Sequence, residues 1–154
     1  MIGALVRMGR GVALAGAAAL ALGMPAPASA QDAPPAVTYR QNVMQAIRTN
    51  VAQLRAVAEV GHPTHTVHYA RALYGLGEML GDAFRNGSAE GSGALPAVWQ
   101  NHAQFEERVA AFRTATAHLL EAAEMRNQSA IQQAVQEVGG TCGACHQVFR
   151  ARTN

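Results

Sequence analysis

The end of the chain reads "GGTCGACHQVFRARTN" and holds both cysteines of the 154-residue sequence, Cys142 and Cys145. His146 follows the second cysteine directly. On a helix of 3.6 residues per turn, these three side chains fall within about 100° of arc on one side. Two thiols can form two thioether bonds to a flat macrocycle, and the adjacent imidazole can bind its iron. C-x-x-C-H is the signature of c-type haem attachment, so we predict one covalently bound haem c.

Three other chemistries compete for the same cysteines. A disulfide between them would close a very small loop and restrain little of the unfolded chain. A thioredoxin-like redox pair needs the dithiol at a helix N-terminus after a strand, and the sequence predicts no strand before Cys142. A zinc site needs more ligands than this one local cluster supplies. Haem attachment is therefore the favoured chemistry.

The other end of the chain has the pattern of an export signal. Arg7 and Arg10 precede an apolar run from Val12 to about Met24, and small residues lead up to Ala30. We expect residues 1–30 to be a signal peptide that is cleaved, which leaves residues 31–154 as one haem-binding domain in the periplasm. The alternative is a retained anchor, but the apolar run is shorter than the ~20 residues of a spanning helix. No membrane span is expected in the mature protein.

The charge of the mature chain excludes some partners. All twelve basic residues are arginine, and the sequence has ten acidic residues. Two arginines leave with the predicted signal peptide, so ten positive charges face ten negative ones. A net charge near zero argues against nucleic acid or anionic membrane as a partner, and against strong electrostatic steering of a redox partner.

Four stretches of the mature chain have apolar residues at steps of three and four, the pattern of amphipathic helices in a bundle. They run over 37–60, 69–84, 105–123 and 131–149. Gly61 and Pro63 end the first stretch, and the glycine- and serine-rich segment 85–96 follows the second. No stretch shows sustained alternation with period two. The sequence therefore predicts an all-α, antiparallel up-down-up-down four-helix bundle.

The position of His146 limits where a second iron ligand could come from. Only eight residues follow it, so a ligand for the opposite face of the haem must come from upstream. The first predicted helix offers Met44. Arg40 lies four residues earlier and hence on the same helix face, with Gln41 beside it.

These segments resemble the class II cytochromes c, the cytochrome c prime group with its low-spin relatives. The resemblance rests on "VGGTCGACHQVFR", "YRQNVM" and "LPAVWQNHAQFEERVAAF", and it spans the mature chain. It implies a left-handed bundle, often a homodimer, with haem c between the helices. The sequence differs from the family pattern in the turn "GHPTHTVH" and in the absence of lysine. Partner docking through lysine patches can therefore not be inferred for this protein from the family.

Position by position, the resemblance implies a set of haem contacts. The thioether attachments would be Cys142 and Cys145, and the axial iron ligand would be His146. The remaining pocket residues would be Arg150 on the proximal side, Arg40 and Gln41 against the haem and its propionates, Met44 over the distal face, and the aromatics Phe84 and Trp99.

Two roles for Met44 stay open at this level. If it binds iron, the protein is a single-electron carrier serving redox partners that the sequence does not identify. If it only covers the iron, the protein binds nitric oxide or carbon monoxide. A haem-free thiol–disulfide oxidoreductase is the third reading, and no other enzymatic machinery is evident. His62, His65 and His68 are read as loop and helix-start residues, since steps of three do not hold all three on one face.

Overall fold

The computed structural model describes residues 34–85 and 91–152. Within them lie four long helices, which are α1 (Pro35–Glu59), α2 (Pro63–Met79), α4 (His102–Glu124) and α5 (Gln128–Phe149). Two short elements lie between α2 and α4. They are the 3-10 helix η2 (Gly81–Phe84) and the one-turn helix α3 (Ala97–Gln100). The predicted signal peptide lies outside the described residues.

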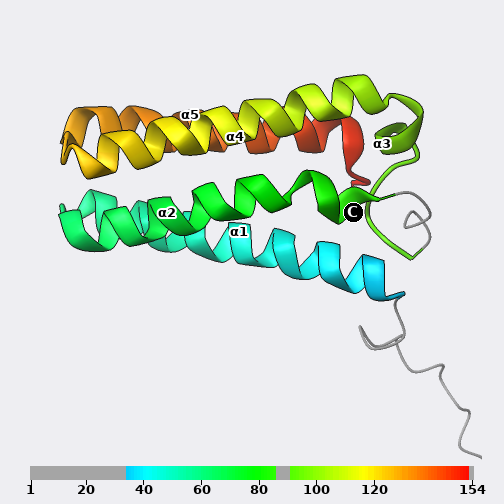
Figure 1. Ribbon diagram of the computed structural model, residues 1–154, viewed down its shortest axis with the longest axis horizontal. Helices are drawn as coiled ribbons and strands as arrows, with labels where there is room; N and C mark the ends of the chain where they lie inside the picture. The colour runs from blue at the N-terminus through cyan, green and yellow to red at the C-terminus, as the bar shows by residue number, and fades with distance from the viewer. Residues whose placement is uncertain (1–33, 86–90, 153–154) are drawn as a thin grey trace, which may run out of the picture.

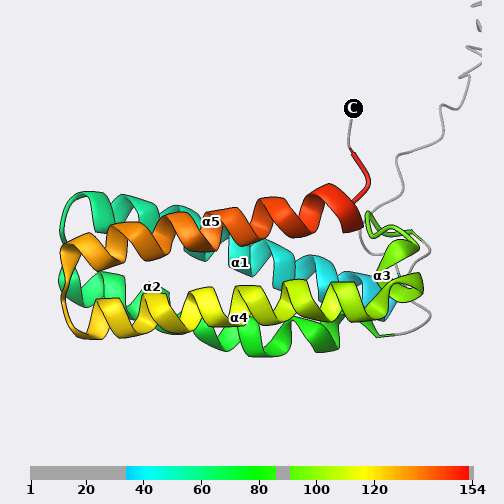
Figure 2. The ribbon, with the colours of Figure 1, turned by 90° about the horizontal axis from the view of Figure 1, so that it is seen from above.

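The long helices form the predicted antiparallel four-helix bundle. Figure 1 shows α4 and α5 as one layer and α1 and α2 as the other, with each helix running opposite to the one before it. Seen from above, α5 lies over α1 and α4 lies over α2 (Figure 2). The four helices therefore occupy the corners of a square in the order α1, α2, α4, α5, and α1 and α5 are neighbours although they are farthest apart in sequence.

The turn between α1 and α2 ends the first helix where the sequence predicted. Gly61 has φ = 72°, a conformation that is open to glycine at little cost. Its neighbour His62 donates its backbone N–H to the Val57 carbonyl at 3.0 Å, and Pro63 begins α2 at a position where a missing N–H costs nothing. This Gly–Pro arrangement reverses the chain within three residues.

The core is formed by the inward stripes of all four helices. Its largest fully buried hydrophobic side chains are Phe105, Leu54, Leu73, Leu119, Ile131, Val37, Val98, Val109 and Val138. The second stripe differs from the expected continuous helix over 69–84. Backbone bonds from Leu80 to Gly77 and from Ala83 to Leu80 tighten the chain into η2, which places Phe84 in a separate 3-10 turn.

α2 and α4 approach each other closely at Gly77. A Cβ atom at this position would lie 3.1 Å from the Thr116 Oγ1 atom of α4. Because Gly77 has no side chain, α2 and α4 can pack closely at this point.

No helix in the described part of the chain has both the length and the apolar composition of a membrane span.

Candidate haem site

A cavity of about 700 Å³ opens between α1 and α5, and α4 forms its floor. It brings together most of the residues that the sequence singled out. Those that line it are Arg40, Gln41, Met44, Phe84, Cys142, Cys145, His146 and Arg150. Its remaining lining is mainly apolar, with Ile47, Val51, Phe105, Val109, Phe112 and Phe149 among the contributors. The fold therefore joins the two ends of the described chain around one space.

Both cysteines lie on the α5 wall and are half-buried free thiols. The Cys142 Sγ atom donates to the Val138 carbonyl at 3.3 Å. Burial raises the pKa of both thiols, and Cys142 further raises that of Cys145. Reactive redox cysteines have the opposite shift and lie at helix N-termini, whereas these lie in the C-terminal half of α5. The geometry thus gives no support to a thiol–disulfide enzyme.

His146 shares the α5 wall with the cysteines, and Met44 faces the same cavity from α1. Burial, and after it the charge of Arg150, lowers the pKa of His146, which favours the neutral imidazole that can bind a metal. Apart from the two cysteines, Met44 and His146 are the lining residues with a sulfur or imidazole donor. They come from opposite walls.

Arg40 is almost completely buried, with 4% of its surface exposed. Its Nε atom donates to the Ala83 carbonyl at 3.0 Å, and its Nη1 atom donates to Ser92 Oγ at 2.9 Å. The guanidinium lies over the rings of Phe84 and Trp99, with centroid distances of 4.7 and 5.6 Å. Arg40 therefore ties the start of α1 to η2 and to the segment that follows it.

We expect Arg40→Ala to lower the free energy of unfolding of the haem-loaded protein by about 3 kcal/mol, because it removes two hydrogen bonds from a charged donor and a cation–π contact. Urea denaturation measures the change. Arg152→Ala is the matched control, since Arg152 is exposed and does not line the cavity, and it should change the same quantity by less than about 0.5 kcal/mol. Equal losses in the two variants would show that Arg40 does not hold these segments together.

The remaining predicted pocket residues differ in their distance from the cavity. Gln41 and Arg150 lie at its edge as exposed side chains, and Phe84 lines it half-buried. Trp99 is not among the lining residues. Its indole Nε1 donates to the Phe84 carbonyl at 3.1 Å, so it supports Phe84 and Arg40 from behind.

The charged side chains among the described residues that line the cavity are all arginines. Five arginines line it, Arg40, Arg48, Arg55, Arg108 and Arg150, and none of the described residues that line it is Asp or Glu. The near-neutral net charge of the sequence does not reveal this local excess of arginine. Sequence reasoning missed Arg48, Arg55 and Arg108. For Arg48, the spacing of four residues from Met44 was the available signal.

Gly139 of α5 lies beside the end of the Arg55 side chain of α1. A Cβ atom there would lie 3.1 Å from Arg55 Nη2, whereas one at Gly140 would meet nothing within 4 Å.

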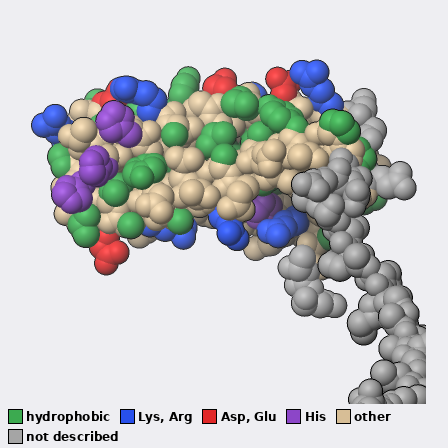
Figure 3. Space-filling model, turned by 90° about the horizontal axis from the view of Figure 1, so that it is seen from below, with side chains coloured by type: hydrophobic (Ala, Val, Ile, Leu, Met, Phe, Trp, Pro, Cys, Tyr) green, Lys and Arg blue, Asp and Glu red, His purple; other side chains and the backbone are tan. Residues whose placement is uncertain are grey.

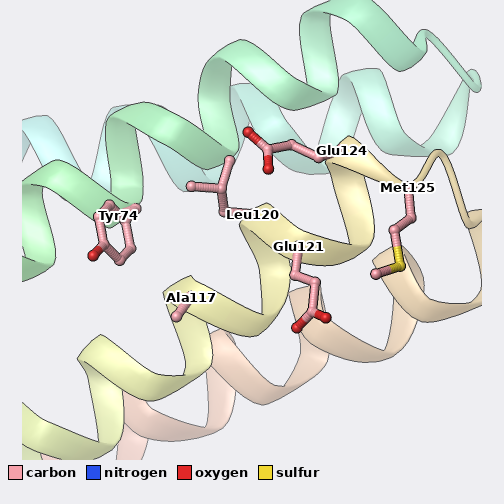
Figure 4. A pocket seen from close by; sticks show the side chains of 6 residues that line it. All are labelled: Tyr74, Ala117, Leu120, Glu121, Glu124 and Met125. Carbon is pink, nitrogen blue, oxygen red and sulfur yellow. The ribbon is translucent and has the colours of Figure 1, made fainter.

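Two other features of the surface are separate from this cavity. A shallow hollow between α2 and α4 is lined by Tyr74, Ala117, Leu120, Glu121, Glu124 and Met125, and carries no cysteine or histidine (Figure 4). His62, His65 and His68 are exposed, and Figure 3 shows histidine side chains at one end of the bundle. Over the described ranges, no cluster of three or more His, Cys, Asp or Glu could hold a metal ion.

The residues of the cavity fit a haem c. Its volume lies within the ~300–1,000 Å³ of typical cofactor sites, and its lining is mainly apolar. Two free thiols and an imidazole lie along one wall, where thioether bonds and an iron ligand are needed. The arginines that line the cavity suit the propionates of the macrocycle.

Comparison with known proteins supports the same assignment. The model of the family described as Cytochrome C' matches residues 35–150. Cytochrome c' of Rhodospirillum rubrum is 32% identical over 128 residues, which cover 79% of this chain and 87% of that protein. Cytochrome c-556 of Agrobacterium tumefaciens is 29% identical over 119 residues, or 75% of this chain and 97% of that one.

Solved structures agree with the sequence relatives. The fold matches the crystal structure of cytochrome c' from Rubrivivax gelatinosus with a TM-score of 0.70 and 28% identity, covering 75% of this chain and 94% of that one. A nitric oxide complex of a cytochrome c prime variant from Alcaligenes xylosoxidans matches with a TM-score of 0.71 and 26% identity, over 76% and 94% of the two chains. The chain therefore belongs to the cytochrome c' family, whose members carry covalently bound haem c and act in electron transfer or gas binding.

Proposed function

We propose that this protein is a periplasmic single-electron carrier in which Cys142 and Cys145 hold haem c through thioether bonds. His146 and Met44 are its two axial ligands. The observation that carries the proposal is the placement of Met44 on α1, across one cavity from the α5 residues Cys142, Cys145 and His146.

The composition of the cavity supports Met44 as the sixth ligand. Among the described residues that line it, Met44 offers the one donor atom suited to haem iron that is not already on the α5 wall. Met44 is also half-buried and packs against the core, so its side chain is restrained beside the cavity. Methionine–histidine ligation raises the reduction potential and leaves no open coordination position.

The haem would supply an iron that gains and loses one electron without any bond being made or broken. The chain's own residues keep this site ready. Phe105, Val109 and Phe112 of α4 exclude water from the floor. The helix α5 fixes the spacing of Cys142, Cys145 and His146 along one wall. A rigid, dry site limits the rearrangement that accompanies each electron transfer.

Gas binding is the second candidate. The observation in its favour is that a structural relative, the Alcaligenes xylosoxidans cytochrome c prime variant, was solved as a nitric oxide complex. In that case Met44 would cover the iron without binding it, and the distal face would accept nitric oxide or carbon monoxide.

Carbon monoxide titration of the ferrous, haem-loaded protein separates the two candidates. An electron carrier with Met44 on the iron should keep its spectrum unchanged at concentrations that saturate a five-coordinate haem. A full spectral conversion would instead establish gas binding. The same sample should undergo reversible one-electron reduction under either candidate.

We infer a cleaved signal peptide over residues 1–30, a single haem domain over residues 31–154, no enzymatic turnover, and a homodimer as the assembly. The redox partner is a periplasmic protein. Mass spectrometry of the exported protein tests the cleavage point, and analytical ultracentrifugation tests the dimer.

The arginines around the cavity predict how the protein exchanges electrons with small charged reagents. The rate constant for oxidation by hexacyanoferrate(III), an anion, should fall roughly tenfold as salt is raised from low to high ionic strength, because salt screens the attraction. The rate constant for the hexaammineruthenium(III) cation should rise over the same range. Stopped-flow measurement checks both, and parallel trends for the two reagents would contradict a positive haem edge.

A further inference from the structure

Arg108 of α4 is the least expected residue in the cavity. Its side chain is half-buried, and its Nε atom is buried without a hydrogen-bond partner. No hydrogen bond or ion pair joins Arg108 to any residue within 34–85 and 91–152. A buried guanidinium N–H without an acceptor costs about 1–3 kcal/mol, so the fold needs an acceptor there.

Within residues 34–85 and 91–152, no carboxylate pairs with Arg108. Glu106 of the same helix pairs with His102 at 3.6 Å, and Glu107 is exposed. No described residue that lines the cavity is acidic. Since no described residue supplies the acceptor, we look for it in the group that fills the cavity.

A haem c carries its strong hydrogen-bond acceptors in one kind of group, the propionate carboxylates. A guanidinium matches a carboxylate with two parallel N–H donors. Arg40, the residue expected to take this role, already uses Nε and Nη1 on Ala83 and Ser92. We propose that Arg108 binds a haem propionate and holds a buried positive charge at the haem edge. This inference rests on the proposed haem site.

Such a pair has two consequences that mere packing would not have. The positive charge of Arg108 favours the reduced state, which carries one more negative charge, and so raises the reduction potential. The same charge favours the ionised propionate, which then has no proton to take up on reduction. The potential of the wild-type protein should thus stay constant between about pH 5 and pH 8.

The experiment is potentiometry of the haem-loaded protein as a function of pH. In Arg108→Gln the equilibrium constant for reduction should fall about tenfold, which is 59 mV for a one-electron couple. The potential should also become pH-dependent in this variant, rising as pH falls, because the released propionate takes up a proton on reduction. Arg108→Lys keeps the charge and should lose much less.

Arg71→Gln is the matched control. It removes one arginine charge at an exposed pair with Glu124, outside the cavity, and should leave the potential and its pH dependence unchanged. The inference would be overturned if the equilibrium constant for reduction of Arg108→Gln stays within twofold of the wild-type value at every pH.

A crystal structure of the haem-loaded wild type tests the contact without any variant. Arg108 Nε should lie within about 3.2 Å of a propionate oxygen. A propionate held elsewhere, with Arg108 Nε away from it, overturns the role of Arg108 but leaves the haem site in place. Absence of haem mass from the wild-type protein would instead refute the haem site itself.

Discussion

Met44→Ala should convert a low-spin haem into a high-spin one, open the iron to carbon monoxide and lower the reduction potential. The thioether of Met44 stands across the cavity from His146, and no other described lining residue outside α5 offers sulfur or imidazole. Without it the sixth position has no protein ligand. We expect the equilibrium constant for reduction to fall at least about tenfold, or 59 mV, since methionine ligation favours the ferrous state. Optical titration with carbon monoxide and potentiometry measure the change.

Two further variants separate ligation from packing. Met44→Leu keeps an apolar side chain of similar volume without the sulfur, and it should behave like Met44→Ala in the spectrum while preserving stability. Met125→Ala removes a methionine that is 69% exposed, outside the cavity, and should leave the spectrum as in the wild type. If the wild type already binds carbon monoxide, and Met44→Leu binds it equally well, then Met44 only covers the iron.

The second large effect concerns the cysteines. The double variant Cys142→Ala, Cys145→Ala should contain no covalently bound haem, whereas the wild-type mass should include one haem that survives denaturation. Each single variant keeps one thiol on the α5 wall and should retain a single thioether bond. Intact mass spectrometry of the denatured proteins shows which of them retain a covalently bound haem.

The double variant should also be less stable than the wild type by several kcal/mol. The cavity is lined by apolar side chains of three helices, and an apolar space without its occupant loses their contacts. Thermal denaturation followed by circular dichroism measures the loss. Covalent haem in the double variant would contradict the assignment of the thioether bonds, and Cys142→Ser, Cys145→Ser provides an independent test with polar replacements.

The features that the sequence predicted well are local in the chain. The four helices follow from apolar spacing within each segment, and the turn at Gly61 follows from one glycine and one proline. The cluster of Cys142, Cys145 and His146 follows from one turn of α5. The family was also predicted, from three sequence motifs, and the comparisons confirmed it.

The features that the sequence did not predict depend on contacts between distant segments. The hydrogen-bond partners of Arg40 lie 43 and 52 residues away, so no local pattern could pair them. The end of α2 at Met79 and the separate turn of η2 reflect backbone bonds rather than apolar spacing. Likewise, the gathering of arginines at one cavity arises only when α1, α4 and α5 assemble, which is why the net charge of the sequence did not reveal it.

The visible and near-infrared absorption spectrum of the oxidised, haem-loaded wild type tests the central claim most directly. With Met44 and His146 both on the iron, the spectrum should be low-spin and should show a methionine–iron charge-transfer band, which disappears in Met44→Leu. A high-spin spectrum without that band would contradict the proposed ligation and would make gas binding the function that the cavity supports.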